Sequence, residues 1–148
     1  MACTSRLIRL GDSGLTVADP AEDVRGRKAV DRDGEEIGKI DDLFVDEQER
    51  RVRFLELQSG GFLGLGGETR LVPVDAVTDI DDDHVYVGES RERIHGSRPY
   101  EPSLAEERSY WEEAYGYYGA APYWGLGYAY PLYPFARRPT EREPDRPA

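Results

Sequence analysis

The chain has 148 residues, with 30 acidic against 19 basic side chains and a net charge of −11. This length corresponds to about one domain. The negative field opposes contact with phosphate backbones, which argues against direct binding of DNA or RNA.

The acidity is concentrated in the middle of the chain, since residues 19–102 hold 22 acidic and 12 basic residues, a net charge of −10. The single cysteine, Cys3, excludes an internal disulfide bond, and no apolar stretch precedes it that would serve secretion or lipidation. We therefore expect a cytoplasmic protein.

Residues 1–18 predict a weakly specified N-terminal extension, in which the polar run at 11–14 forms a turn between two short extended pieces. Further along, Asp33 and Gly34 lie between two strand-like runs and predict a β-hairpin, because both turn positions tolerate positive φ. Apolar residues change parity along the second arm of this hairpin, which predicts a bulge near Gly38.

Short strand-like runs with turn residues between them then recur as far as Val87. This spacing favours a small barrel or sandwich over a βαβ arrangement. After the last strand, Ser90 is placed to cap a short helical turn that ends at Gly96. The apolar residues expected to form the core are Val30, Ile37, Ile40, Leu43, Val45, Phe54, Leu55, Leu57, Val72, Val74, Val77, Ile80, Val85 and Val87.

One further helix is predicted near the end of the chain. Ser103 and Glu106 have the spacing of a capping box, in which each side chain satisfies the other residue's backbone N–H. The helix over residues 103–116 carries Trp111 and Tyr115 on one stripe, and such a stripe typically packs on the parent domain.

Several segments together resemble the PRC-barrel family, whose fold is shared by the cytoplasmic part of the photosynthetic reaction-centre H subunit and the C-terminal domain of the ribosome maturation factor. The matching segments are residues 26–28, 33–42, 60–64 and 71–77. The chain also resembles stand-alone bacterial PRC-barrel proteins that end in an aromatic, glycine-rich tail. The resemblance implies a small barrel and leaves the function open.

The expected fold class is all-β, with a small six-stranded antiparallel barrel of the PRC type and a short C-terminal helix. The expected organisation is an N-terminal extension at 1–18, the barrel domain at 19–102, the helix at 103–116 and a disordered, low-complexity Tyr/Gly/Pro-rich tail at 117–148.

No catalytic, cofactor or metal site is predicted. His84 and His95 are not accompanied by a nucleophile motif or by metal-ligand spacing. The acidic runs at 41–46 and 81–83 lack the alternating spacing and closing glutamate of a calcium loop. The glycine-rich loop at 60–67 lacks the following helix and the Lys-Ser/Thr pair of a phosphate-binding loop.

Two segments are candidate partner-binding surfaces. The loop at 60–67 carries Phe62, Leu63 and Leu65, which either plug one end of the barrel or contact a partner. The helix and the uncharged aromatic stretch at 114–136 supply the other candidates. These are Trp111, Tyr115, Tyr123 and Trp124.

The uncharged stretch has the length of a membrane span, but its prolines, glycines and tyrosine hydroxyls argue against a transmembrane segment. Its aromatic rings, followed by Arg137 and Arg138, leave peripheral contact with a membrane open. The commoner property of such a composition is weak multivalent binding by a disordered segment.

The predicted function is that of a non-enzymatic PRC-barrel binding or adaptor module, which mediates protein–protein interaction or self-association without a cofactor. One alternative is an accessory role in ribosome or RNA maturation through a basic ribosomal protein. The other is association with a membrane electron-transfer complex, as in the reaction-centre H subunit, with Glu35, Glu36, Asp41 and Asp42 passing protons.

Overall fold

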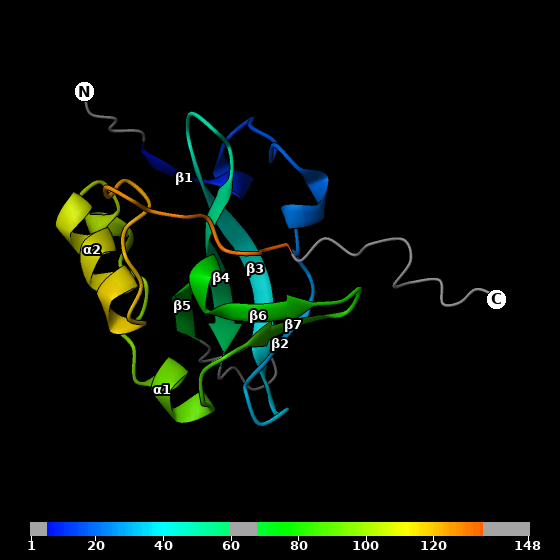
Figure 1. Ribbon diagram of the computed structural model, residues 1–148. Coiled ribbons are helices and arrows are strands. Elements are labelled where there is room, and N and C mark those ends of the chain that lie inside the picture. Colours follow the sequence, from blue (N-terminus) through cyan, green and yellow to red (C-terminus); the bar gives the residue numbers. More distant parts are fainter. Residues whose placement is uncertain (1–5, 60–67, 135–148) are drawn as a thin grey trace.

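The computed structural model describes residues 6–59 and 68–134 (Figure 1). The strands are β1 (Leu7–Arg9), β2 (Lys28–Val30), β3 (Glu36–Asp46), β4 (Val52–Ser59), β5 (Glu68–Pro73), β6 (Val77–Ile80) and β7 (His84–Val87). The helices are α1 (Arg91–His95) and α2 (Arg108–Tyr117), and short 3-10 turns lie at Leu10–Asp12, Pro20–Glu22, Val74–Ala76 and Pro102–Leu104.

Six strands form one curled, half-barrel sheet in the order β5-β4-β3-β2-β7-β6, and β1 adds to β3 (Figure 1). The predicted barrel-like β fold is confirmed, but the prediction of a wholly antiparallel sheet is wrong, because β2 and β7 pair in parallel. The chain crosses from β5 at one edge to β6 at the other through the Val74–Ala76 turn. This crossover brings β7 beside β2 in the same direction, and strand spacing alone does not reveal it.

The first hairpin joins β2 to β3 as predicted. Gly34 has a φ of 85° in its turn. The Asp31 carboxylate accepts the backbone N–H of Asp33 at 2.9 Å and that of Glu35 at 2.8 Å. Turn chemistry that is local in sequence therefore fixes the start of β3.

The predicted bulge at Gly38 is also confirmed. The pairing of β2 with β3 shifts register here, since Ala29 lies opposite Gly38 and Val30 lies opposite Glu36. A Cβ atom at Gly38 would lie 2.3 Å from the backbone oxygen of Gln58 in β4. Glycine therefore allows β3 to approach β4 more closely than any other residue would.

Every residue of the predicted core is buried. Most of them, including Leu43 and Leu55, fill the inside of the curl. Phe54 instead belongs to a second cluster, together with residues of α2 and with Phe44, which the predicted core did not include. The strands β3 and β4 are therefore covered on both faces, which explains why apolar residues alternate imperfectly along them.

The helix α2 starts later than predicted, at Arg108, and its N-cap residue Glu107 makes no side-chain capping bond. The capping box predicted for Ser103 and Glu106 is therefore wrong, and residues around Ser103 form a 3-10 turn instead. A cap contributes about 1 kcal/mol, less than the burial of Trp111 against the sheet, so packing sets the start of the helix. The predicted cap of α1 is confirmed, since Ser90 Oγ accepts the backbone N–H of Arg93 at 3.2 Å.

The described part of the tail is ordered, so the prediction of disorder over 117–148 is wrong as far as residue 134. The tail leaves the end of α2 and passes across the sheet (orange in Figure 1). Tyr133 is buried, and its hydroxyl donates to the backbone oxygen of Glu22 at 2.6 Å. The composition of the tail is typical of disorder, and it does not reveal that a tyrosine hydroxyl finds a hydrogen-bond acceptor more than a hundred positions earlier in the chain.

Substituting Gly38 tests the close approach of β3 to β4. We expect Gly38→Ala to lower the free energy of unfolding by about 3 kcal/mol, because the methyl group meets the Gln58 backbone. The matched control is Gly34→Ala, which has positive φ but open space around its Cβ position and so costs about 1 kcal/mol. Equal midpoints in urea unfolding for the two variants would contradict this account.

Candidate interaction surfaces

The predicted partner-binding residues fall into three groups. Phe62, Leu63 and Leu65 lie outside the described residues. Trp111 and Tyr115 are buried. Tyr123 and Trp124 in the tail are half-buried.

Trp111 and Tyr115 pack against the sheet, as their stripe on the helix predicted. The Trp111 ring lies 5.2 Å from that of Phe44 and 5.0 Å from that of Phe54, and Tyr115 lies 4.6 Å from Phe54. The Trp111 indole N–H donates to the backbone oxygen of Ala105 at 2.8 Å. Their surfaces are occupied within the chain, so a partner would not reach them while α2 stays docked.

Tyr123 and Trp124 each lie beside an arginine. The Arg53 guanidinium is 4.3 Å from the centroid of the Tyr123 ring, and the Arg108 guanidinium is 4.3 Å from that of Trp124. Trp124 also meets Tyr115 edge-on at 6.0 Å. The structure thus gives both residues roles in attaching the tail to the domain, and each keeps some exposed surface.

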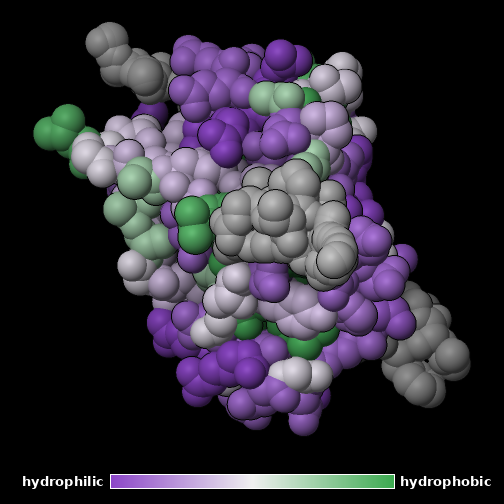
Figure 2. Space-filling view, turned by 45° about the vertical axis from the view of Figure 1, so that its right-hand side comes forward, coloured by the Kyte–Doolittle hydropathy of each residue, from purple (hydrophilic) through white to green (hydrophobic). Residues whose placement is uncertain are grey.

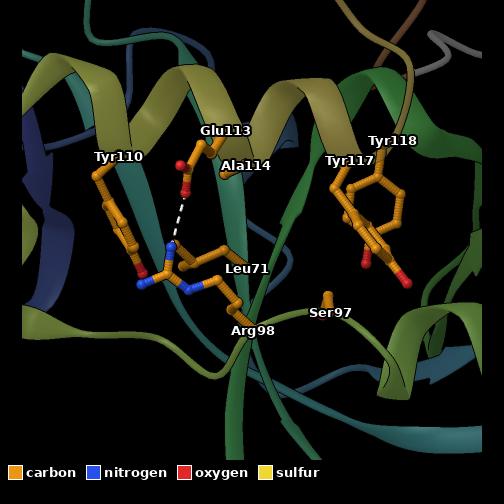
Figure 3. A pocket seen from close by; sticks show the side chains of 8 residues that line it. All are labelled: Leu71, Ser97, Arg98, Tyr110, Glu113, Ala114, Tyr117 and Tyr118. Carbon is orange, nitrogen blue, oxygen red and sulfur yellow. Dashed lines mark hydrogen bonds and ion pairs between the residues drawn. The ribbon is translucent and has the colours of Figure 1, made fainter.

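A cavity of about 270 Å³ lies between α2 and the segment that follows α1 (Figure 3). Its lining consists of Leu71, Ser97, Arg98, Tyr110, Glu113, Ala114, Tyr117 and Tyr118. Figure 3 shows Tyr110 and Tyr117 at opposite ends, with an ion pair of 2.6 Å joining Arg98 to Glu113. Its volume lies just below the usual range of small-molecule sites, which is about 300–1,000 Å³.

A buried ionic cluster lies where the tail crosses the sheet. The Glu22 carboxylate accepts Arg51 Nε at 2.9 Å and the backbone N–H of Val52 at 2.8 Å. Next along β4, Arg53 lies 3.3 Å from Asp46 Oδ1. These carboxylates and guanidinium groups are paired, and the cluster lies beneath Tyr123 and Tyr130 of the tail.

Asp75 lies under the same tail. Burial raises the pKa of its carboxyl group, while the Tyr128 hydroxyl, which donates to Asp75 Oδ2 at 2.9 Å, acts in the opposite direction. The tail therefore supplies a donor to a carboxylate that would otherwise be poorly satisfied in the protein interior.

Two large apolar side chains of the tail are left in solvent. Leu126 is fully exposed, at 106% of its reference area, and Leu132 is 80% exposed. By contrast, the face of the molecule drawn in Figure 2 is mostly hydrophilic, and its hydrophobic areas are small and separated. These leucines were not among the predicted contact residues, although they are the only large aliphatic residues in the uncharged stretch at 114–136.

The loop between β6 and β7 carries the acidic run at 81–83, which lacks the spacing of a calcium loop. Asp81 accepts the Tyr86 hydroxyl at 2.7 Å, and it also accepts the backbone N–H groups of Asp83 and His84. The Tyr86 bond, followed by the backbone bonds, lowers the pKa of Asp81 to about 2. This carboxylate closes the turn, so its hydrogen bonds have a structural role.

Across residues 6–59 and 68–134, no cluster of three or more His, Cys, Asp or Glu side chains is arranged to hold a metal ion. In the same part of the chain, neither helix is long and apolar enough to cross a bilayer.

The comparisons with known proteins identify the domain. The family model of the PRC-barrel domain matches residues 18–94. The matched range begins just before the Pro20–Glu22 turn and ends within α1, and so includes strands β2 to β7. No curated protein matches the chain.

The role of Tyr86 predicts a measurable change in titration. We expect Tyr86→Phe to raise the pKa of Asp81 from about 2 toward its ordinary value of 3.8, as followed by the carboxyl carbon in an NMR titration. Because the folded-state pKa is depressed, the stability that this carboxylate contributes is present above pH 3.8 and is lost as the pH falls through about 2. An unchanged titration midpoint of Asp81 in Tyr86→Phe would show that the backbone N–H groups of Asp83 and His84 lower its pKa, and not the Tyr86 hydroxyl.

Proposed function

The chain belongs to the PRC-barrel family, and from this membership and the exposed leucines of its tail we propose that it is a non-enzymatic binding module that attaches to a partner protein. The domain supplies a rigid platform, and the tail displays apolar contacts on it. The observation that carries the proposal is the exposure of Leu126 and Leu132 on a segment that is otherwise anchored.

Anchored leucines are effective contact residues for a physical reason. Burying a leucine side chain in an interface contributes about 1.5–3 kcal/mol, but a flexible segment loses much of this gain when it is ordered. Tyr123, Trp124 and Tyr133 already hold the tail against the domain. Binding through the two leucines therefore requires little further ordering of the backbone.

The charge of the domain indicates the surroundings of the contact. Residues 19–102 carry a net charge of −10. The negative field would attract a partner whose binding site has a basic rim, and an apolar recess in that site would accept the leucines. Phosphate-rich partners would be repelled by the same field.

The proposal is tested by changing both leucines without disturbing the fold. In a crosslinking pull-down from native cell extract, we expect Leu126→Ser with Leu132→Ser to retain at least about tenfold less of the partner that the unchanged chain retains. Because both side chains are exposed, the thermal midpoint should not change.

The matched control is Ala121→Ser with Ala129→Ser, which adds the same hydroxyls at two exposed positions of the same segment and removes no large apolar group. This control should retain the partner at the level of the unchanged chain. Retention of the same partner at the same level by the leucine variant would contradict the proposal.

A further inference from the structure

The inner side of the tail has its own recognition chemistry, distinct from that of the exposed leucines. We call residues 121–134 the strap. The Tyr130 hydroxyl donates to the backbone oxygen of Val52 at 2.8 Å and lies 3.3 Å from Glu22 Oε1. The Tyr133 hydroxyl donates to the Glu22 backbone oxygen, and the Tyr128 hydroxyl to Asp75. Three tyrosine hydroxyls thus reach acceptors on one side of the barrel.

The same surface also binds the tyrosine rings. The Arg51 guanidinium is 3.6 Å from the centroid of the Tyr130 ring, and the Arg53 guanidinium is 4.3 Å from that of Tyr123. Cation–π contacts of this kind are stronger when the cation is partly desolvated, as both arginines are here. Together with Glu22, the two arginines form a receptor for tyrosine side chains. We call Glu22, Arg51 and Arg53 the receptor.

The strap is attached by side chains and not by sheet pairing. Among the described residues, the backbone–backbone hydrogen bonds of the strap join only strap residues to each other. The N–H of Gly125 donates to the oxygen of Pro122, and the N–H of Tyr128 donates to the oxygen of Gly125. Detaching the strap therefore breaks no strand pair of the barrel. The chain before it turns at Gly119, which has a φ of 72° and open space around its Cβ position, so the connection can be redirected.

The attached state is also imperfect. Arg53 Nε, Asp75 Oδ1 and Tyr115 Oη are buried and have no hydrogen-bond partner within the described residues. Arg53 and Asp75 both contact the strap, through Tyr123 and Tyr128. Buried polar atoms without partners are costly, so the closed strap lies closer in free energy to an open state than its contacts alone suggest.

From these observations we propose that the receptor binds the strap of a second copy of this chain, so that two molecules associate by exchanging their straps. The tyrosine contacts that seat the strap run from its side chains to the barrel, and Trp124 packs on α2. All of these contacts are reproduced when the strap belongs to another molecule. The exchanged pair satisfies the same hydroxyls and rings, and it brings the exposed leucines of each strap to a second molecule. This association concerns the inner side of the strap and is independent of the partner proposed above.

Concentration decides which arrangement is populated. A short connection gives the chain's own strap an effective concentration of the order of millimolar at the receptor. The closed monomer therefore dominates in dilute solution. Weakening the attachment within one chain should reveal the exchange at much lower concentration.

A pair of complementary full-length variants tests the exchange. Tyr130→Ala weakens the strap and leaves the receptor intact. Arg51→Lys keeps a positive charge beside Glu22 but replaces the guanidinium that stacks on Tyr130, so it weakens the receptor and leaves the strap intact. We expect each variant alone to be monomeric and an equimolar mixture to contain one-to-one dimers, measured by native mass spectrometry with one variant isotopically labelled. A mixture that stays monomeric up to about 1 mM would overturn the proposal.

A second measurement does not depend on the dimer. A fluorescently labelled peptide with the sequence of residues 121–134 is titrated into full-length Tyr130→Ala, and its anisotropy should rise on binding. A matched peptide with phenylalanine in place of Tyr130 should bind about fivefold more weakly, because it lacks one neutral hydrogen bond. If Tyr130→Ala fails to fold, Tyr130→Phe takes its place, and absence of binding to either folded variant overturns the proposal.

These experiments use only purified chain and peptide. Loss of the dimer with retention of the pull-down partner would reject the exchange and leave the binding function in place. Formation of the dimer by chains that carry Leu126→Ser would show that the exchange does not depend on the outer side of the strap.

Discussion

The burial of β3 and β4 on both faces is the constraint on which the other elements depend. A sheet this small has one face for its own core, and the other face of these two strands must be covered by additional chain. Phe44 and Phe54 lie on that second face, and α2 covers them with Trp111 and Tyr115. The helix is therefore part of the folded unit, although the matched family segment ends at residue 94.

Buried carboxylates hold the flanking segments against the same strand. Glu56 in β4 accepts both Nε and Nη2 of Arg9 at 2.7 and 2.8 Å, which ties the N-terminal extension to the sheet. Glu22 accepts Arg51 Nε and the backbone N–H of Val52, the first residue of β4, and it lies 3.3 Å from the Tyr130 hydroxyl of the strap. A buried pair of this kind contributes little net stability, but removing one partner leaves an uncompensated charge. The pairs therefore specify where each flanking segment docks.

The sequence predicts what is decided locally. Asp33 and Gly34 fix a turn, Ser90 caps a helix, and the apolar pattern identifies the buried residues. The parallel pairing of β2 with β7 depends on a crossover between opposite edges of the sheet. The start of α2 depends on the packing of Trp111 against Phe44 and Phe54. Neither is visible in local patterns.

The strap was misjudged for a similar reason, because a Tyr/Gly/Pro composition is typical of disordered segments and its acceptors lie about a hundred positions earlier. The sequence did contain one feature that indicates the outer side of the strap, which is the pair of isolated leucines in an uncharged stretch. Leu126 and Leu132 differ in type from the tyrosines around them, and they are the large hydrophobic residues of the described strap that are left exposed. Single apolar residues of a different type thus marked the outer side of the segment.

The absence of charge in residues 114–136 has a consequence for how the strap is held. A basic strap would be attracted to an acidic domain, but salt would screen that attraction within about 10 Å at 0.1 M ionic strength. An acidic strap would be repelled. Tyrosine supplies donors to carboxylate and carbonyl oxygens, and a ring for Arg51, without adding any charge. Attachment through tyrosines therefore persists over a wide range of ionic strength, and the strap stays in place on a domain whose charge would otherwise make its docking depend on salt.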